Sequence, residues 1–179
     1  MNRRTGKALI AASLLLITQS AGAQVTALVG GNVVDLDGGP ALENAVVLIE
    51  GERISAIGSR DDIEVPADAT VIDQSGQWLI PGLMNMHVHM GLVLPGKMAY
   101  ELADETDANL ALRMAAAARE TLQAGVTTIR LPGDSRHVDL ALDRSIRKGE
   151  STGPRIFSAG ESLVITGGHG SEAGRIYAD

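Results

Sequence analysis

Two of the four histidines in the chain stand two residues apart, in the segment His87-Val88-His89. In a β-strand, residues two apart point to the same face, so the two imidazoles would project together. Two imidazoles on one face can bind one divalent cation such as Zn²⁺. The alternative is a pair of partly buried histidines whose ring nitrogens bond to the backbone. The spacing therefore raises a metal site as a hypothesis, which depends on the surrounding elements.

An alternation of strands and helices is expected around this pair, from Pro81 onward. Runs of apolar and β-branched residues predict three strands, over Leu83–His89, Val126–Leu131 and Pro154–Gly160. Strands separated by helices favour parallel pairing with right-handed crossovers, in a doubly wound sheet or a (β/α)₈ barrel. The histidine pair then lies at the carboxyl end of the first strand, where such barrels build their active sites.

Two helices are expected between these strands. Residues 106–124 are rich in good helix formers, and Thr106 or Asp107 can cap their start. Ser135 can cap the second helix, and Gly149 can end it. The apolar positions that share one face of this second helix are Val138, Leu142 and Ile146. Each helix therefore has an apolar stripe that can pack against the predicted sheet.

A β-rich region is expected before the histidine pair, over residues 24–80. The segment "AVVLIEGERISAIGS" places two runs of β-branched residues around a short glycine-containing turn, which is typical of a hairpin. The segment "ATVIDQSGQWLIP" repeats this arrangement around Ser75-Gly76 and predicts a second hairpin. No stretch in this region favours a helix longer than one turn. We interpret residues 24–80 as a small β module.

Composition excludes some classes of partner and of covalent link. The formal net charge of -7 argues against nucleic acid, which binds a basic face. Cysteine is absent from the sequence, so no disulfide can form. Aromatic residues make up only 2% of the chain, so its core must be built from aliphatic side chains.

The first 23 residues are typical of a secretory signal peptide. Basic residues precede an apolar run over residues 8–18, and the small residues Ala21 and Ala23 match the pattern that signal peptidase accepts. The alternative is a membrane anchor, but a spanning helix needs about 20 apolar residues. We expect a periplasmic or secreted protein that has no membrane association after cleavage.

The residues around the histidine pair resemble a known family. The segment "VIDQSGQWLIPGLMNMHVHM" is similar to the junction between a β-sandwich module and a (β/α)₈ barrel in the amidohydrolase superfamily of metal-dependent hydrolases. The segment "LQAGVTTIRLPGD" resembles the family's second barrel strand, and "GPRIFSAGESLVITGGHG" resembles the third strand and loop of the imidazolonepropionase-like and Xaa-Pro-dipeptidase-like branch. The resemblance implies an α/β fold, with a β-sandwich module over residues 24–80 and the first three βα units of a TIM barrel over residues 81–179.

The resemblance also implies roles for individual residues. His87 and His89 match the first-strand metal ligands, so the implied cofactor is a divalent metal, Zn²⁺ by preference, with one or two ions in a full-length enzyme. His169 matches a pocket-lining loop histidine and Arg130 matches the arginine of the second strand, so both are candidates for substrate binding. The alternative for His169 is a glycine-rich loop without a site role, and for Arg130 a structural pairing with a carboxylate. Asn85 is expected to support the strand rather than to act in catalysis.

Other parts of the family's site have no match in the sequence. A bridging lysine, further histidine ligands and a late general-base aspartate cannot be assigned. Three strands alone would also leave unpaired sheet edges. We therefore expect the N-terminal part of a longer enzyme that hydrolyses C–N bonds, in a dipeptide or an N-acyl amino acid. The alternatives are an inactive truncated product, a non-enzymatic binding module and a doubly wound binding protein, and a homo-oligomer is left open.

Overall fold

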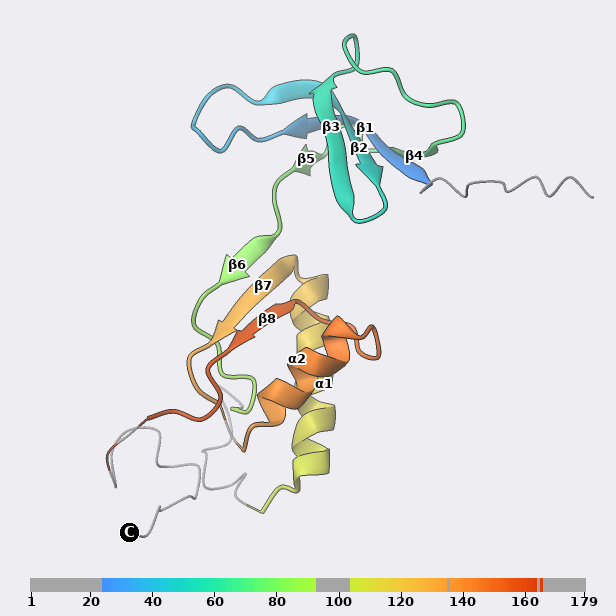
Figure 1. Cartoon of the computed structure of the whole chain (residues 1–179). Coiled ribbons are helices and arrows are strands. Elements are labelled where there is room, and N and C mark those ends of the chain that lie inside the picture. The colour runs from blue at the N-terminus through green and yellow to red at the C-terminus, as the bar shows by residue number, and fades with distance from the viewer. Residues whose placement is uncertain (1–23, 93–103, 135, 164, 166–179) are drawn as a thin grey trace, which may run out of the picture. The chain divides into compact units, whose positions relative to one another are not determined.

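The computed structural model describes residues 24–92, 104–134, 136–163 and 165. The chain divides into two compact units, residues 1–80 and residues 81–179 (Figure 1). The expected signal peptide over residues 1–23 and the candidate His169 lie outside the described residues. Among the described residues, no helix has both the length and the apolar character that a membrane crossing needs.

The first unit is one five-stranded sheet. Its strands are β1 (Val25–Val33), β2 (Leu42–Glu50), β3 (Arg53–Ser59), β4 (Thr70–Asp73) and β5 (Trp78–Leu79). The order is β3-β2-β1-β4, and β5 also pairs with β1. Strands β1, β2 and β3 are antiparallel neighbours, so the hairpin predicted for β2 and β3 is confirmed.

The second predicted hairpin is wrong, because β4 and β5 pair with β1 and run parallel to it. The turn between them follows the edge of β1: the Gln74 N–H donates to the Val29 carbonyl, and the Asn32 N–H donates to the Gln77 carbonyl. Gly30 has a φ of +87°, and a Cβ there would lie 2.7 Å from the Ser75 hydroxyl oxygen. The absence of a side chain at Gly30 therefore lets the turn lie close to β1, and β5 pairs with the same edge of β1 as β4.

The core of the first unit lies between the sheet and the loop that joins β3 to β4. Ala27, Val29, Val46 and Leu48 form its buried apolar cluster, and Ile63, Val65 and Ala69 are among the partly buried residues packed against it. All of these strands belong to one hydrogen-bonded sheet. The β-rich prediction is therefore confirmed, whereas a sandwich of two packed sheets does not occur within residues 24–80.

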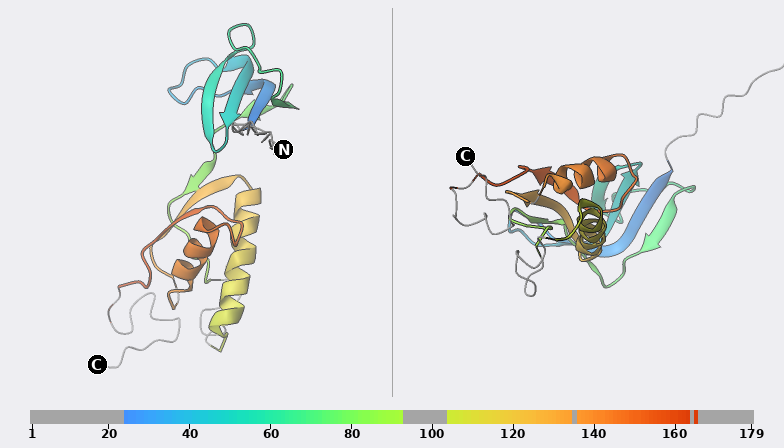
Figure 2. Two further views of the ribbon diagram at one scale, coloured as in Figure 1. Left: turned by 45° about the vertical axis from the view of Figure 1, so that its right-hand side comes forward. Right: turned by 90° about the horizontal axis from the view of Figure 1, so that it is seen from below.

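The second unit is a parallel sheet with helices packed on one face. Its elements are β6 (Leu83–Asn85), α1 (Asp107–Gln123), β7 (Val126–Leu131), α2 (Val138–Arg147) and β8 (Arg155–Ser158). Strands β6, β7 and β8 are neighbours in that order and are parallel, as the alternation predicted. Figure 2 shows the two helices next to each other along this sheet. The buried residues Leu110, Met114, Ile129, Leu131, Leu142 and Ile156 fill the space between helices and sheet.

The first parallel strand is shorter than predicted. It ends at Asn85, and the side-chain oxygen of Asn85 accepts a hydrogen bond from the His87 N–H at 3.1 Å. An asparagine that bonds to the backbone two residues on turns the chain. His87 and His89 therefore lie in a bend after the strand, rather than within it.

The helix caps agree with the sequence in one of two cases. The Thr106 hydroxyl accepts from the Asn109 N–H at 3.2 Å and caps α1, as predicted. The cap predicted for α2 at Ser135 is wrong, because its N-cap is His137. Arg136 and His137 have φ values of 59° and 55°, and this left-handed backbone delays the helix until Val138.

Candidate metal centre

The side chains of His87 and His89 meet in the bend that follows β6. Their Nε2 atoms lie 3.2 Å apart. The ring centroids are 5.1 Å apart and the ring planes are inclined at 71°. His87 is exposed, whereas His89 is half-buried. The geometry therefore brings the two predicted ligands together, with the Nε2 atoms of the two rings within hydrogen-bond distance of each other.

A backbone carbonyl fixes the orientation of His89. Its Nδ1 atom lies 2.6 Å from the carbonyl oxygen of Gly133, in the loop after β7. A carbonyl oxygen only accepts hydrogen bonds, so Nδ1 carries the proton of the neutral ring. The lone pair is then on Nε2, the atom that faces His87. In metal sites, a ligand histidine generally donates its other N–H to a carbonyl or carboxylate in this way.

The spacing of the two Nε2 atoms suits one cation. Two nitrogens that each bind a tetrahedral zinc ion at about 2.05 Å lie about 3.3 Å apart, close to the observed 3.2 Å. The spacing of the two rings therefore fits a divalent ion, to which they would supply two ligands. Within the described residues, no group of three or more His, Cys, Asp or Glu side chains could hold a metal ion.

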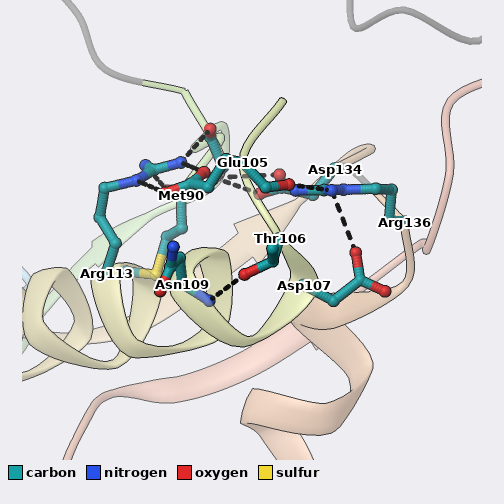
Figure 3. A network of polar contacts seen from close by, with 9 residues as sticks. Met90, Glu105, Thr106, Asp107, Asn109, Arg113, Asp134 and Arg136 are labelled. Carbon is teal, nitrogen blue, oxygen red and sulfur yellow. Dashed lines mark hydrogen bonds and ion pairs between the residues drawn. The ribbon is translucent and has the colours of Figure 1, made fainter. Parts of the chain in front are cut away.

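The residue that follows this bend is held on both sides of its backbone. The Gly91 N–H lies 3.0 Å from each carboxylate oxygen of Asp134. The Gly91 carbonyl accepts from the Arg113 guanidinium at 3.1 Å. Arg113 is in turn bound by Glu105 through two hydrogen bonds, of 3.0 and 2.6 Å. Figure 3 shows this network at the start of α1.

The charge of Arg113 is stabilised within the same network. The hydrogen bonds that Arg113 donates to Glu105 raise the pKa of Arg113 above its ordinary value, and the charges of Glu105 and Asp134 act in the same direction. Burial lowers the pKa of Arg113, but its effect is smaller than that of the hydrogen bond. The guanidinium is therefore a permanent cation beside the bend.

Comparison with known proteins returns enzymes of one superfamily. The chain is 31% identical to ochratoxinase from Aspergillus niger over 158 residues, which are 87% of this chain and 32% of that protein. It is 29% identical to imidazolonepropionase from Anaeromyxobacter dehalogenans, over 79% of this chain and 33% of the relative. The solved structure of a prolidase complexed with N-methylphosphonate-L-proline matches with a TM-score of 0.72 and 34% identity, over 87% of this chain and 36% of that one. The chain belongs to the amidohydrolase superfamily.

The extent of this match limits what it says about activity. No family model matches the chain. The chain spans about a third of the length of the curated relatives that it matches. The family resemblance read from the sequence is therefore confirmed, while the activity of the whole protein is a matter for a proposal.

Arg130 lies beside the bend that carries His87 and His89. Its guanidinium donates to the Met86 carbonyl at 3.3 Å, and its own carbonyl accepts from the Val88 N–H at 3.1 Å. Arg130 is exposed, on the sheet face opposite the helices, between the buried residues Ile129 and Leu131. The structure therefore brings Arg130 close to the His87–His89 segment.

Sequence reasoning assigned no site role to Gly133, Asp134 or Arg113. One signal was available for two of them, because Pro132-Gly133-Asp134 directly follows β7. Polar residues at the carboxyl ends of parallel strands commonly belong to active sites. No comparable signal marked Arg113, whose type and position are ordinary for the middle of an amphipathic helix.

Proposed function

We propose that this protein is a metal-dependent hydrolase of C–N bonds that acts on a dipeptide or an N-acyl amino acid. Its amidohydrolase relatives are hydrolases that act on C–N bonds. The observation that carries the proposal is the pair of Nε2 atoms at 3.2 Å, with the Nδ1 atom of His89 bonded to a carbonyl. This arrangement leaves the lone pair of His89 on Nε2, the atom that lies next to Nε2 of His87.

The residues of the chain have distinct roles in the proposed reaction. His87 and His89 would hold the divalent ion, for which we propose Zn²⁺, because imidazole nitrogens suit it. A divalent ion held there would supply a Lewis acid for the scissile carbonyl and for the attacking water. Arg130 offers an exposed guanidinium near the pair, which suits the carboxylate of a dipeptide or an N-acyl amino acid. His169 is a further proposed substrate contact.

A zinc titration tests the proposed metal site. The 179-residue chain is titrated with Zn²⁺ in competition with a chromophoric chelator, alongside His87→Ala, His89→Ala and the double variant. We expect each single variant to lose saturable binding to the level of the double variant. The control is His137→Asn, which changes an exposed histidine outside the pair at a left-handed position that asparagine tolerates. Equal zinc affinity in the wild type and the double variant would rule out this site.

A second candidate function is metal binding without turnover. It is favoured by the described residues, which supply two metal ligands where catalytic zinc sites commonly have three protein ligands. Hydrolysis assays on Xaa-Pro dipeptides and N-acyl amino acids, with Zn²⁺ and with a chelator, separate the two functions. Turnover that requires metal and is lost in His87→Ala supports the hydrolase. Zinc binding without turnover supports the second candidate.

We also propose that the protein acts in the periplasm or outside the cell. The proposal is supported by the basic start, the short apolar run and the Ala21-Gly22-Ala23 pattern. Expression in a bacterial host and sequencing of the exported protein should give Gln24 as the first residue. Retention of the intact N-terminus in the exported fraction would contradict the proposal.

A further inference from the structure

The bend that carries the histidine pair is tied to the loop after β7 by two contacts. His89 meets the Gly133 carbonyl through Nδ1, and two residues later the Gly91 N–H meets the Asp134 carboxylate. Neighbouring residues of one loop therefore bind both ends of a three-residue segment. Because the segment is short, a shift of Gly91 also shifts the His89 ring.

Arg113 closes the arrangement from the opposite side. Its guanidinium donates to the Gly91 carbonyl at 3.1 Å, while Glu105 binds the same guanidinium through two hydrogen bonds. The side chains of Arg113 and Glu105 are 27% and 17% exposed. An ion pair that is largely shielded from water keeps a defined geometry better than an exposed one. Gly91 is thus held through its N–H by Asp134 and through its carbonyl by Arg113, an arrangement that we name the Gly91 clamp.

Asp134 is itself anchored to the third strand unit. Its backbone N–H donates to the Gly160 carbonyl at 2.8 Å. The Gly160 N–H in turn donates to the Ser158 hydroxyl at the end of β8. The clamp therefore joins the carboxyl ends of all three described parallel strands, rather than only the first two.

We propose that Arg113 and Asp134 are positioning residues, which hold His89 with its proton on Nδ1 and its Nε2 lone pair directed at the metal position. The part of this inference that concerns metal rests on the proposed function. The part that concerns the ring does not, because the bond to Gly133 exists without any ion. The tautomer of a histidine is set by the bond that its other nitrogen makes.

Nitrogen NMR of the metal-free chain tests the clamp directly. At about pH 8, where an ordinary histidine is neutral, the ring nitrogens of His89 should show the proton on Nδ1, and the Gly91 amide should exchange slowly. Asp134→Ala and Arg113→Met should shift His89 toward the other tautomer and speed Gly91 exchange. Asp134→Asn retains an acceptor for the Gly91 N–H and should preserve much of the wild-type signal.

A matched control separates positioning from general stability. Arg147→Met removes an arginine that pairs with Asp143 within α2 and is outside the clamp. It should leave the His89 tautomer unchanged. A wild-type His89 with its proton on Nε2 would overturn the proposal, and so would clamp variants that fold and keep the wild-type tautomer. If a clamp variant unfolds, the wild-type tautomer and the Asp134→Asn spectrum decide the matter.

Zinc affinity adds a separate measurement. Loss of residues that orient a ligand typically weakens metal binding about 10–100-fold, and we expect this range for Asp134→Ala and Arg113→Met, with Arg147→Met unchanged. Clamp-dependent tautomers in a chain that never binds zinc would support the clamp and overturn the metal function. Zinc binding that is insensitive to both clamp variants would overturn the clamp's role in the site.

Discussion

The carbonyl of Gly133 meets His89 at a position that has no room for a side chain. A Cβ on Gly133 would fall on the side chain of Ser162 and within 3.0 Å of its Cα. Any larger residue would push the loop away from Ser162 and would move the carbonyl that His89 binds. The glycine is therefore a requirement of the site's geometry, rather than of a turn with positive φ.

In the first unit, hydrogen bonds from Ser75 change the pKa of Asp73. The Ser75 hydroxyl and then the Ser75 N–H lower the pKa of Asp73 below its ordinary value of 3.8. A carboxyl with a depressed folded-state pKa adds stability above the unfolded pKa, and this stability is lost as pH falls through the folded value. The contribution is therefore present at neutral pH and is lost in the acid range below about pH 3.8.

Ser75→Ala should raise the pKa of Asp73 toward its ordinary value, because the largest cause of the depression is removed while the backbone bond remains. An NMR titration of the Asp73 carboxyl measures this change. Ser55→Ala is the matched control, since its hydroxyl bonds to the Leu48 carbonyl in the same sheet. An Asp73 titration that is the same in Ser75→Ala and the wild type would contradict the prediction.

At the scale of elements, the start of α1 depends on one hydroxyl. Thr106 is exposed and bonds to the Asn109 N–H, so its replacement changes the cap and little else. Thr106→Ala should lower the free energy of unfolding of the second unit by about 1 kcal/mol. Urea denaturation followed by helical circular dichroism measures this loss, because the described helices all lie in that unit. Thr106→Ser is the control, and a loss as large as that of alanine would argue against capping.

The elements that sequence predicted well are those decided by local pattern. Residues 106–124 combine helix formers, a threonine cap and a following glycine, and α1 begins and ends close to these marks. The second predicted hairpin failed because β4 and β5 share the edge of β1, a partner about 45 residues away in the chain. Local spacing has no information about such a partner.

The candidate site also has features that local sequence predicts and features that depend on residues far apart in the chain. The convergence of His87 and His89 was predictable from their spacing, although a bend rather than a continuous strand produces it. The Gly91 clamp was not predictable, because it joins positions 22 and 43 residues apart. Only the fold brings Asp134 and Arg113 to the N–H and the carbonyl of Gly91.

At the scale of the whole molecule, one face of the parallel sheet is uncovered within the described residues. We name this the open face, and its exposed apolar residues include Met84, which is 70% exposed, and Phe157, which is 58% exposed. Both helices pack against the opposite face, where Ile129 and Ile156 are buried. Apolar side chains gathered on one surface favour association, whereas scattered ones do not.

We therefore expect the 179-residue chain to self-associate through the open face as its concentration rises. The double variant Met84→Ser with Phe157→Ser should shift sedimentation velocity profiles toward the monomer. Leu112→Ser is the control, because Leu112 is 72% exposed but lies on α1. If the two variants sediment alike, exposure alone decides association and the open face has no special role. If only the sheet variant becomes monomeric, the apolar surface opposite the helices drives the contact. The proposed metal site lies outside the substituted positions, so any zinc affinity should be the same in both variants.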